Sequence, residues 1–188
     1  MKFQSLLEKP SNKILLMSFI LSFIMTWVFV IFIFGPLLAQ FPAEAGLMDM
    51  KAAWTKKNMD KIINIWKKES LTHYIELMTF VNNIDFIFMV VYGWAVFSGL
   101  LLVARQLKDS EKLQKVYLNL SIVSWVSVLF DVIEGIFIAI ILLDPSNITE
   151  TSAIGVSLSA TLCIIVLYSC VFLWIIGLLI VLVKHLKK

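Results

Sequence analysis

Four long apolar blocks constrain this chain more than any other feature. They cover about residues 14–38, 77–103, 116–143 and 153–183, and each is longer than twenty residues. A helix of ~20 apolar residues is long enough to cross a hydrocarbon core of ~30 Å. The chain is also 60% hydrophobic over its 188 residues, whereas soluble domains are about 45–50% apolar. We therefore predict an all-α fold for residues 1–188: a single integral membrane domain built as a four-helix bundle.

The polar segment between the first two blocks predicts an amphipathic helix over about residues 48–68. Apolar residues recur at helical spacing, and six lysines are assigned mostly to the opposite face: Lys51, Lys56, Lys57, Lys61, Lys67 and Lys68. Such a helix either lies flat on the lipid surface, with Trp66 at headgroup level, or caps the mouth of the bundle. The pattern favours the lipid surface.

Orientation follows from the basic residues beside the spans. The turn 144–152 has no Lys or Arg. Short basic flanks occur at three other places, namely the N-terminal segment with Lys2, Lys9 and Lys13, the loop after the second span with Arg105, Lys108, Lys112 and Lys115, and the C-terminal tail with Lys184, Lys187 and Lys188. Basic flanks favour the cytoplasmic side. We predict a bacterial inner-membrane protein with both termini in the cytoplasm, and we place the lysine-rich helix outside although it runs against the charge rule.

Composition excludes several classes of function. The net charge is only +3, with no basic face left for nucleic acid once the flanking lysines are set aside. The only histidines are His73 and His185, neither within a span, which argues against a zinc hydrolase, a Ser-His-Asp triad and bis-His haem. Cys163 and Cys170 lie too far apart on one helix to form a disulfide, so we expect buried thiols. The sequence does not identify a metal or a cofactor, and it favours a protein that is not an enzyme.

Three acids lie inside the apolar blocks, where an ionisable group costs about 2.5–3.5 kcal/mol on insertion scales. They are Asp85, Asp131 and Glu134. At a helical rise of 1.5 Å per residue, Asp85 lies about 12 Å, Glu134 about 13 Å and Asp131 about 18 Å below the same membrane boundary. Helical phase also directs them to facing sides of neighbouring spans. The sequence therefore predicts one acidic cluster.

The predicted site combines these acids with two hydrogen-bonding neighbours on the second span, Asn82 and Tyr92. No Lys or Arg lies within a span at this depth. Three close carboxylates cannot all stay ionised in a low dielectric. We therefore expect the compensating positive charge to be a proton, a metal ion, or the cationic group of a ligand or lipid.

Several segments resemble a family of uncharacterised bacterial four-span membrane proteins. The segments are Pro42-Ala43-Glu44-Ala45-Gly46-Leu47, Ile84-Asp85-Phe86-Ile87-Phe88 with Tyr92-Gly93, and Leu129-Phe130-Asp131-Val132-Ile133-Glu134-Gly135. The family has an Asp-aromatic-Leu-Phe element followed by Tyr in the second span and Asp-x-x-Glu-Asn in the third. Gly135 stands where the family has Asn. The resemblance covers most of the chain and implies the location of a site, without an activity.

These observations favour a multi-pass protein that binds or translocates a cation, a proton, or an amine-bearing small molecule or lipid. The alternative is a non-catalytic structural or accessory subunit whose buried acids only fix helix packing. A lipid-acting enzyme with a carboxylate base is the least favoured. The bilayer is the expected partner, and a homo-oligomer is left open.

Overall fold

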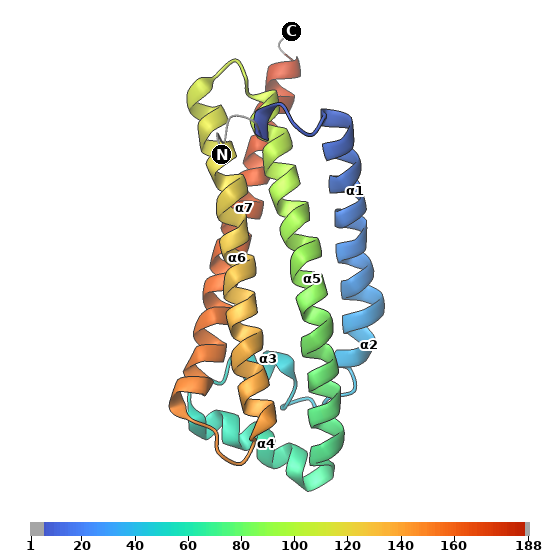
Figure 1. The fold of residues 1–188 in the computed structure, drawn as a ribbon, viewed down its shortest axis with the longest axis vertical. Coiled ribbons are helices and arrows are strands. Elements are labelled where there is room, and N and C mark those ends of the chain that lie inside the picture. The colour runs from blue at the N-terminus through green and yellow to red at the C-terminus, as the bar shows by residue number, and fades with distance from the viewer. Residues whose placement is uncertain (1–5, 187–188) are drawn as a thin grey trace. The chain divides into compact units, whose positions relative to one another are not determined.

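A computed structural model describes residues 6–186 of the chain, and these are almost entirely helical, without a strand. The elements in chain order are α1 (Asn12–Val28), the π-helix η2 (Phe29–Phe34), α2 (Gly35–Leu38), α3 (Leu47–Lys51), α4 (Lys56–Glu69), α5 (Leu71–Gln106), α6 (Glu111–Leu143) and α7 (Glu150–Leu186) (Figure 1). The predicted all-α fold is confirmed.

Four helical stretches are long and apolar enough to cross a membrane. They are Asn12–Leu38, Leu71–Gln106, Glu111–Leu143 and Glu150–Leu186, and each contains one of the predicted apolar blocks. The helices extend beyond the blocks because polar turns continue them past the apolar residues. The protein is thus a multi-pass membrane protein by helix length and composition. Its orientation stays a prediction, and three lysines on which that prediction rests, Lys2, Lys187 and Lys188, lie outside the described residues.

The first span contains a π-helical turn, and a proline accounts for its position. Pro36 has no N–H, and its ring crowds the carbonyl four residues earlier. The chain widens just before it, so that the Gly35 N–H donates to the Val30 carbonyl, five residues back. A π-turn of this kind keeps the helix continuous where a proline would otherwise break it.

The described chain divides into two compact helical units. Unit 1 comprises the described parts of Met1–Thr26, Val90–Val128 and Ile164–Lys188. In it the Arg105 guanidinium, at the end of α5, donates to the carbonyls of Leu6 and Pro10 and to Asn12 Oδ1 at 2.6–3.2 Å. This fork-shaped group uses several of its five donors at once and fastens the segment before α1 to α5.

Unit 2 comprises Trp27–Met89 and Leu129–Cys163, and its core joins α4 to α5 and α6. The apolar face of α4 is fully covered by protein: Met59, Ile62, Ile63 and Trp66 are buried with residues of α5 and α6. Figure 1 shows α4 crossing the ends of these helices. The prediction that this face lies on lipid is wrong, because the helix uses it to cap unit 2.

The predicted continuous helix over 48–68 is interrupted after Lys51. Trp54 takes a left-handed conformation, with φ 55°, and its N–H donates to Ser157 Oγ on α7 at 2.9 Å. Thr55 then caps α4, because its hydroxyl accepts from the Asn58 N–H at 3.3 Å. Two helices, α3 and α4, therefore replace one.

Candidate functional site

Three of the predicted site residues are acids that come together in unit 2. Asp85 is on α5, Asp131 and Glu134 are on α6, and all three are buried. Asp85 and Glu134 interact electrostatically with each other and with Asp131. The sequence placed these carboxyls at similar depth on neighbouring helices, and the structure brings them into one cluster.

A lysine from outside the spans enters the cluster. Lys51 Nζ lies 2.8 Å from Glu134 Oε1, and the Glu134 side chain is only 2% exposed. Lys51 also interacts electrostatically with Asp85 and Asp131. The expectation that the positive charge must come from a proton, a metal ion or a ligand is therefore wrong in one respect: the chain supplies one ammonium itself. Its assignment to the outward lysine face is wrong as well.

The electrostatics of Lys51 combine two opposing effects. Burial, the larger single effect, lowers the pKa of the ammonium, because the charged form loses its hydration. The three carboxyl groups, Glu134 foremost, raise it, and together they bring the pKa of Lys51 above its usual value of 10.5. Lys51 is therefore a charged ammonium at neutral pH, held in place by the acids.

Short-range contacts explain why Lys51 points inward. At the start of α3 the Gly46 N–H donates to the Asp49 carboxylate at 2.8 Å, which caps this helix of five residues. Met50 is buried in the core of unit 2. Before α3, the Ala45 carbonyl accepts from Trp66 Nε1 at 2.8 Å. With these contacts made, the last residue of α3 is directed at α6.

Asn82, another predicted site residue, bridges α5 and α6. Its Nδ2 donates to the Gly135 carbonyl at 3.1 Å. Its Oδ1 and Glu134 Oε2 are buried acceptors to which no group of the described chain donates. A buried acceptor without a donor costs about 1–3 kcal/mol. The cluster thus holds more hydrogen-bond acceptors than its own donors satisfy.

Gly135 lies beside the Asn82 amide oxygen, where a side chain would crowd it. A Cβ at this position would lie 3.2 Å from Asn82 Oδ1 and 3.0 Å from the Phe86 ring. The glycine that departs from the resembled family pattern therefore has a local reason, because a side chain here would press against Asn82 and Phe86.

The last predicted site residue, Tyr92, belongs to unit 1, where it is buried. Its predicted role as a hydrogen-bonding neighbour of the acids stays a prediction. The fourth span contributes in a way that the sequence did not indicate. Ser157 of α7 accepts from the Trp54 N–H and so holds the turn that follows Lys51.

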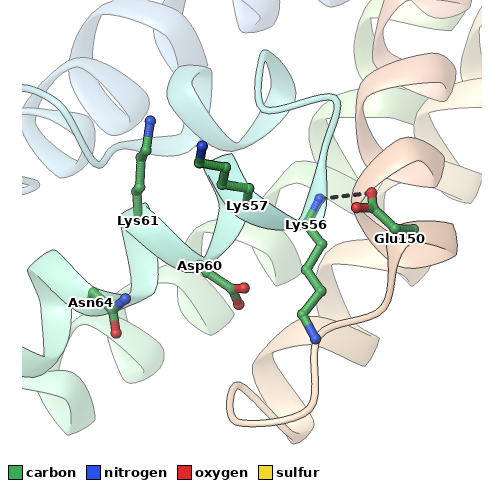
Figure 2. A pocket seen from close by; sticks show the side chains of 6 residues that line it. All are labelled: Lys56, Lys57, Asp60, Lys61, Asn64 and Glu150. Carbon is green, nitrogen blue, oxygen red and sulfur yellow. Dashed lines mark hydrogen bonds between the residues drawn. The ribbon is translucent and has the colours of Figure 1, made fainter.

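Three lysines of α4, Lys56, Lys57 and Lys61, line an open hollow of ≈ 420 Å³ on unit 2. Figure 2 shows Lys57 and Lys61 extending from α4 in the same direction, while the Lys56 backbone N–H donates to Glu150 at 2.9 Å. Asp60 and Glu150 place negative charge among these lysines. Because the charges are mixed and exposed to solvent, this hollow is a weaker candidate than the buried cluster.

The buried cluster presents carboxyl and amide oxygens, which accept hydrogen bonds from N–H and O–H donors. Within residues 6–186, no three His, Cys, Asp or Glu side chains gather closely enough to hold a metal ion. Cys163 and Cys170 are buried free thiols, as expected. Comparison of the chain with family models, with curated proteins and with solved structures finds no match. Functional inference therefore depends on the geometry of the site.

Proposed function

We propose that the chain is a membrane protein whose buried acidic cluster binds or translocates a positively charged species: a proton, or the ammonium group of a small molecule or lipid. The observation that carries this proposal is an imbalance of charge. Three buried carboxyls interact with one partly buried lysine. Like charges close together in a low dielectric cannot all persist, so the cluster needs positive charge beyond Lys51.

Two further facts support the proposal. Asn82 Oδ1 and Glu134 Oε2 are acceptors without a donor from the described chain, which is what a site for an N–H or O–H donor provides. The Lys51 side chain is 18% exposed, whereas that of Glu134 is 2% exposed. The stem of Lys51 therefore marks a path between the surface of unit 2 and the acids.

The test compares the protein in lipid nanodiscs with a neutralised variant that carries Asp85→Asn, Asp131→Asn and Glu134→Gln. Asp109→Asn is the matched control, because Asp109 is exposed. Infrared spectroscopy at neutral pH reports a protonated carboxyl through its carbonyl stretch, and a weakly buffered titration reports protons released when cation salts are added. We expect both signals in the protein and in the control, and neither in the neutralised variant. Absence of both signals from the unmutated protein would refute the proposal.

A structural role is the second candidate, and the Lys51–Glu134 ion pair favours it. The pair joins α3 to α6 with a 2.8 Å contact, and buried acids that only fix packing would make such contacts. Under this alternative, cells that carry the neutralised variant behave like cells that carry the unmutated protein. Replacing buried ionic groups by neutral groups of similar shape is often neutral or stabilising, so unchanged stability without loss of function would support this candidate.

The predicted orientation is part of the same proposal. With both termini in the cytoplasm of a bacterial inner membrane, unit 2 would open its Lys51 path to the outside. Single cysteines at Lys57 and Lys108, both exposed, distinguish the two sides. A membrane-impermeant maleimide should label Lys57→Cys in intact cells and should leave Lys108→Cys unlabelled until the membrane is opened. The reverse pattern would overturn the orientation.

A further inference from the structure

The geometry around Glu134 points to the class of ligand. Resting on the proposed function, we infer that the acidic cluster is a binding site for a primary ammonium group, and that Lys51 is a tethered competitor which occupies this site when no external amine is bound. The same chemistry is offered by a free primary amine and by an aminolipid headgroup.

The site already holds an ammonium group, that of Lys51. A –NH₃⁺ group presents three donors and no acceptor. Lys51 Nζ directs one contact to Glu134 Oε1 at 2.8 Å and interacts electrostatically with Asp85 and Asp131. An external primary ammonium carries the same charge on the same group. The structure therefore shows a site of the right composition, filled by the chain's own side chain.

Lys51 leaves two acceptors of the cluster open. Glu134 Oε2 and Asn82 Oδ1 are both buried and lack a donor from the described residues. The Asn82 amide is oriented by its bond to the Gly135 carbonyl, and Gly135 has no side chain to crowd the amide oxygen. A ligand ammonium with fewer constraints than a tethered lysine can use acceptors that Lys51 does not reach.

α3 is held by contacts other than the Lys51 side chain, so it can keep its place when another ammonium replaces that of Lys51. The Lys51 side chain takes no part in these contacts, which also hold the segment before α3. They are the cap of α3, the burial of Met50 and the bond from Trp66 to the Ala45 carbonyl. The four-carbon stem of a lysine is flexible and carries a compact charge. Withdrawal of the side chain along its exposed part would open the site while α3 keeps its place.

The composition of the site also predicts its selectivity. Carboxylate and amide oxygens select N–H donors, whereas quaternary ammonium groups have none and are bound by aromatic faces. A metal ion needs several ligands at short distance, and the described residues do not gather three His, Cys, Asp or Glu side chains for one. The site should therefore prefer primary amines over tetramethylammonium and over divalent metals.

The test uses the full chain with Lys51→Ala in nanodiscs of phosphatidylcholine, whose headgroup has no N–H. Ethylammonium chloride is the probe, and tetramethylammonium chloride at equal concentration controls for charge and ionic strength. We expect ethylammonium to raise the thermal midpoint of Lys51→Ala and to bind it about tenfold more tightly than it binds the unmutated protein, as follows if Lys51 occupies the site roughly nine-tenths of the time. Lys61→Ala, which removes an exposed lysine of α4, should bind ethylammonium as the unmutated protein does.

A second arm separates the two sources of amine. Nanodiscs that contain phosphatidylethanolamine should stabilise Lys51→Ala without added ethylammonium if a lipid headgroup reaches the site, and should have no effect if only free amines do. If Lys51→Ala does not fold, Lys51→Gln replaces it, since it keeps most of the stem, and the unmutated protein still reports ethylammonium binding that Glu134→Gln should abolish.

The outcomes distinguish this inference from the proposed function. Equal stabilisation of the Lys51 variants by ethylammonium and tetramethylammonium would overturn the inference and leave a general cation site. Ethylammonium affinity that does not change when Lys51 is replaced would also overturn it, because Lys51 would not be a competitor. Loss of proton and cation signals in the unmutated protein would instead refute the proposed function.

Discussion

Replacement of Lys51 by methionine should destabilise the protein more than any change to a single acid of the cluster. Methionine keeps an unbranched stem but removes the ammonium, which leaves Glu134 and its neighbouring carboxyls buried without their counter-charge. Removing one partner of a buried ion pair costs about 3–5 kcal/mol. For a chain of this size that corresponds to a fall of about 6–20 °C in the thermal midpoint.

Glu134→Gln should cost less, about 1–3 kcal/mol. In this variant Lys51 keeps its interactions with Asp85 and Asp131, and the glutamine still offers an acceptor. The two residues should also be coupled. The double variant should be less destabilised than the sum of the single variants, by about 0.5–3 kcal/mol, which is the range for residues in contact.

The assay is reversible unfolding by denaturant in mixed micelles, followed by two independent probes whose transitions must coincide. Lys61→Met is the matched control, because Lys61 is exposed on α4 and its change should stay within about 0.5 kcal/mol. A Lys51→Met cost no larger than that of Glu134→Gln, or costs that simply add, would show that Lys51 does not carry the charge balance of the cluster.

Three further predictions follow from other contacts. Gly155→Ala should destabilise the protein by about 1–3 kcal/mol, because the added Cβ would lie 2.6 Å from Phe137 ring carbons. The same change should cost less in a Phe137→Ala background, and equal costs in both backgrounds would contradict this explanation. Arg105→Lys keeps the charge but loses the several donors that Arg105 directs to the segment before α1. Amide hydrogen exchange in that segment should become faster, and unchanged exchange would show that these bonds do not hold the segment in place. The carboxyls raise the pKa of Lys51 above 10.5, so the contribution of its ammonium to stability is lost as the pH rises through the folded pKa. The stability difference between the protein and Lys51→Met should therefore shrink above about pH 10, and a difference that keeps growing there would refute the sign.

The helices and the acids could be predicted because both depend on local patterns. Length and apolar content identify a spanning helix whatever it packs against. The positions of Asp85, Asp131 and Glu134 follow from helical rise and phase, given that consecutive spans joined by a short loop are neighbours. The structure brings these three residues together in unit 2.

The role of Lys51 could not be predicted from the same patterns. On a continuous helix over 48–68 Lys51 lies at the edge of the apolar stripe, three residues after Met48 and four before Thr55, but its charge led to its assignment to the solvent face with the other lysines. The helix ends at Lys51 because the next turn is held by a bond from Trp54 to Ser157, a residue more than one hundred positions further along the chain. The sequence did contain one local sign of the interruption. Thr55 is a good N-cap residue, and its hydroxyl accepts from the Asn58 N–H at the start of a new helix.

The origin of this lysine has a consequence for how the site is assembled and used. A lysine within a span would have to enter the hydrocarbon with the acids, and each such group costs about 2.5–3.5 kcal/mol at the helix centre. Lys51 avoids that cost, because it lies on a short helix between spans and can join the acids once α5 and α6 have packed. We therefore expect the acids to insert with protons and to exchange one of them for the ammonium of Lys51 when α3 packs against α6. A charge that arrives last by a side-chain movement can also be displaced by the reverse movement, and this is why a competing amine, rather than a rearrangement of the spans, is the expected way to open the site.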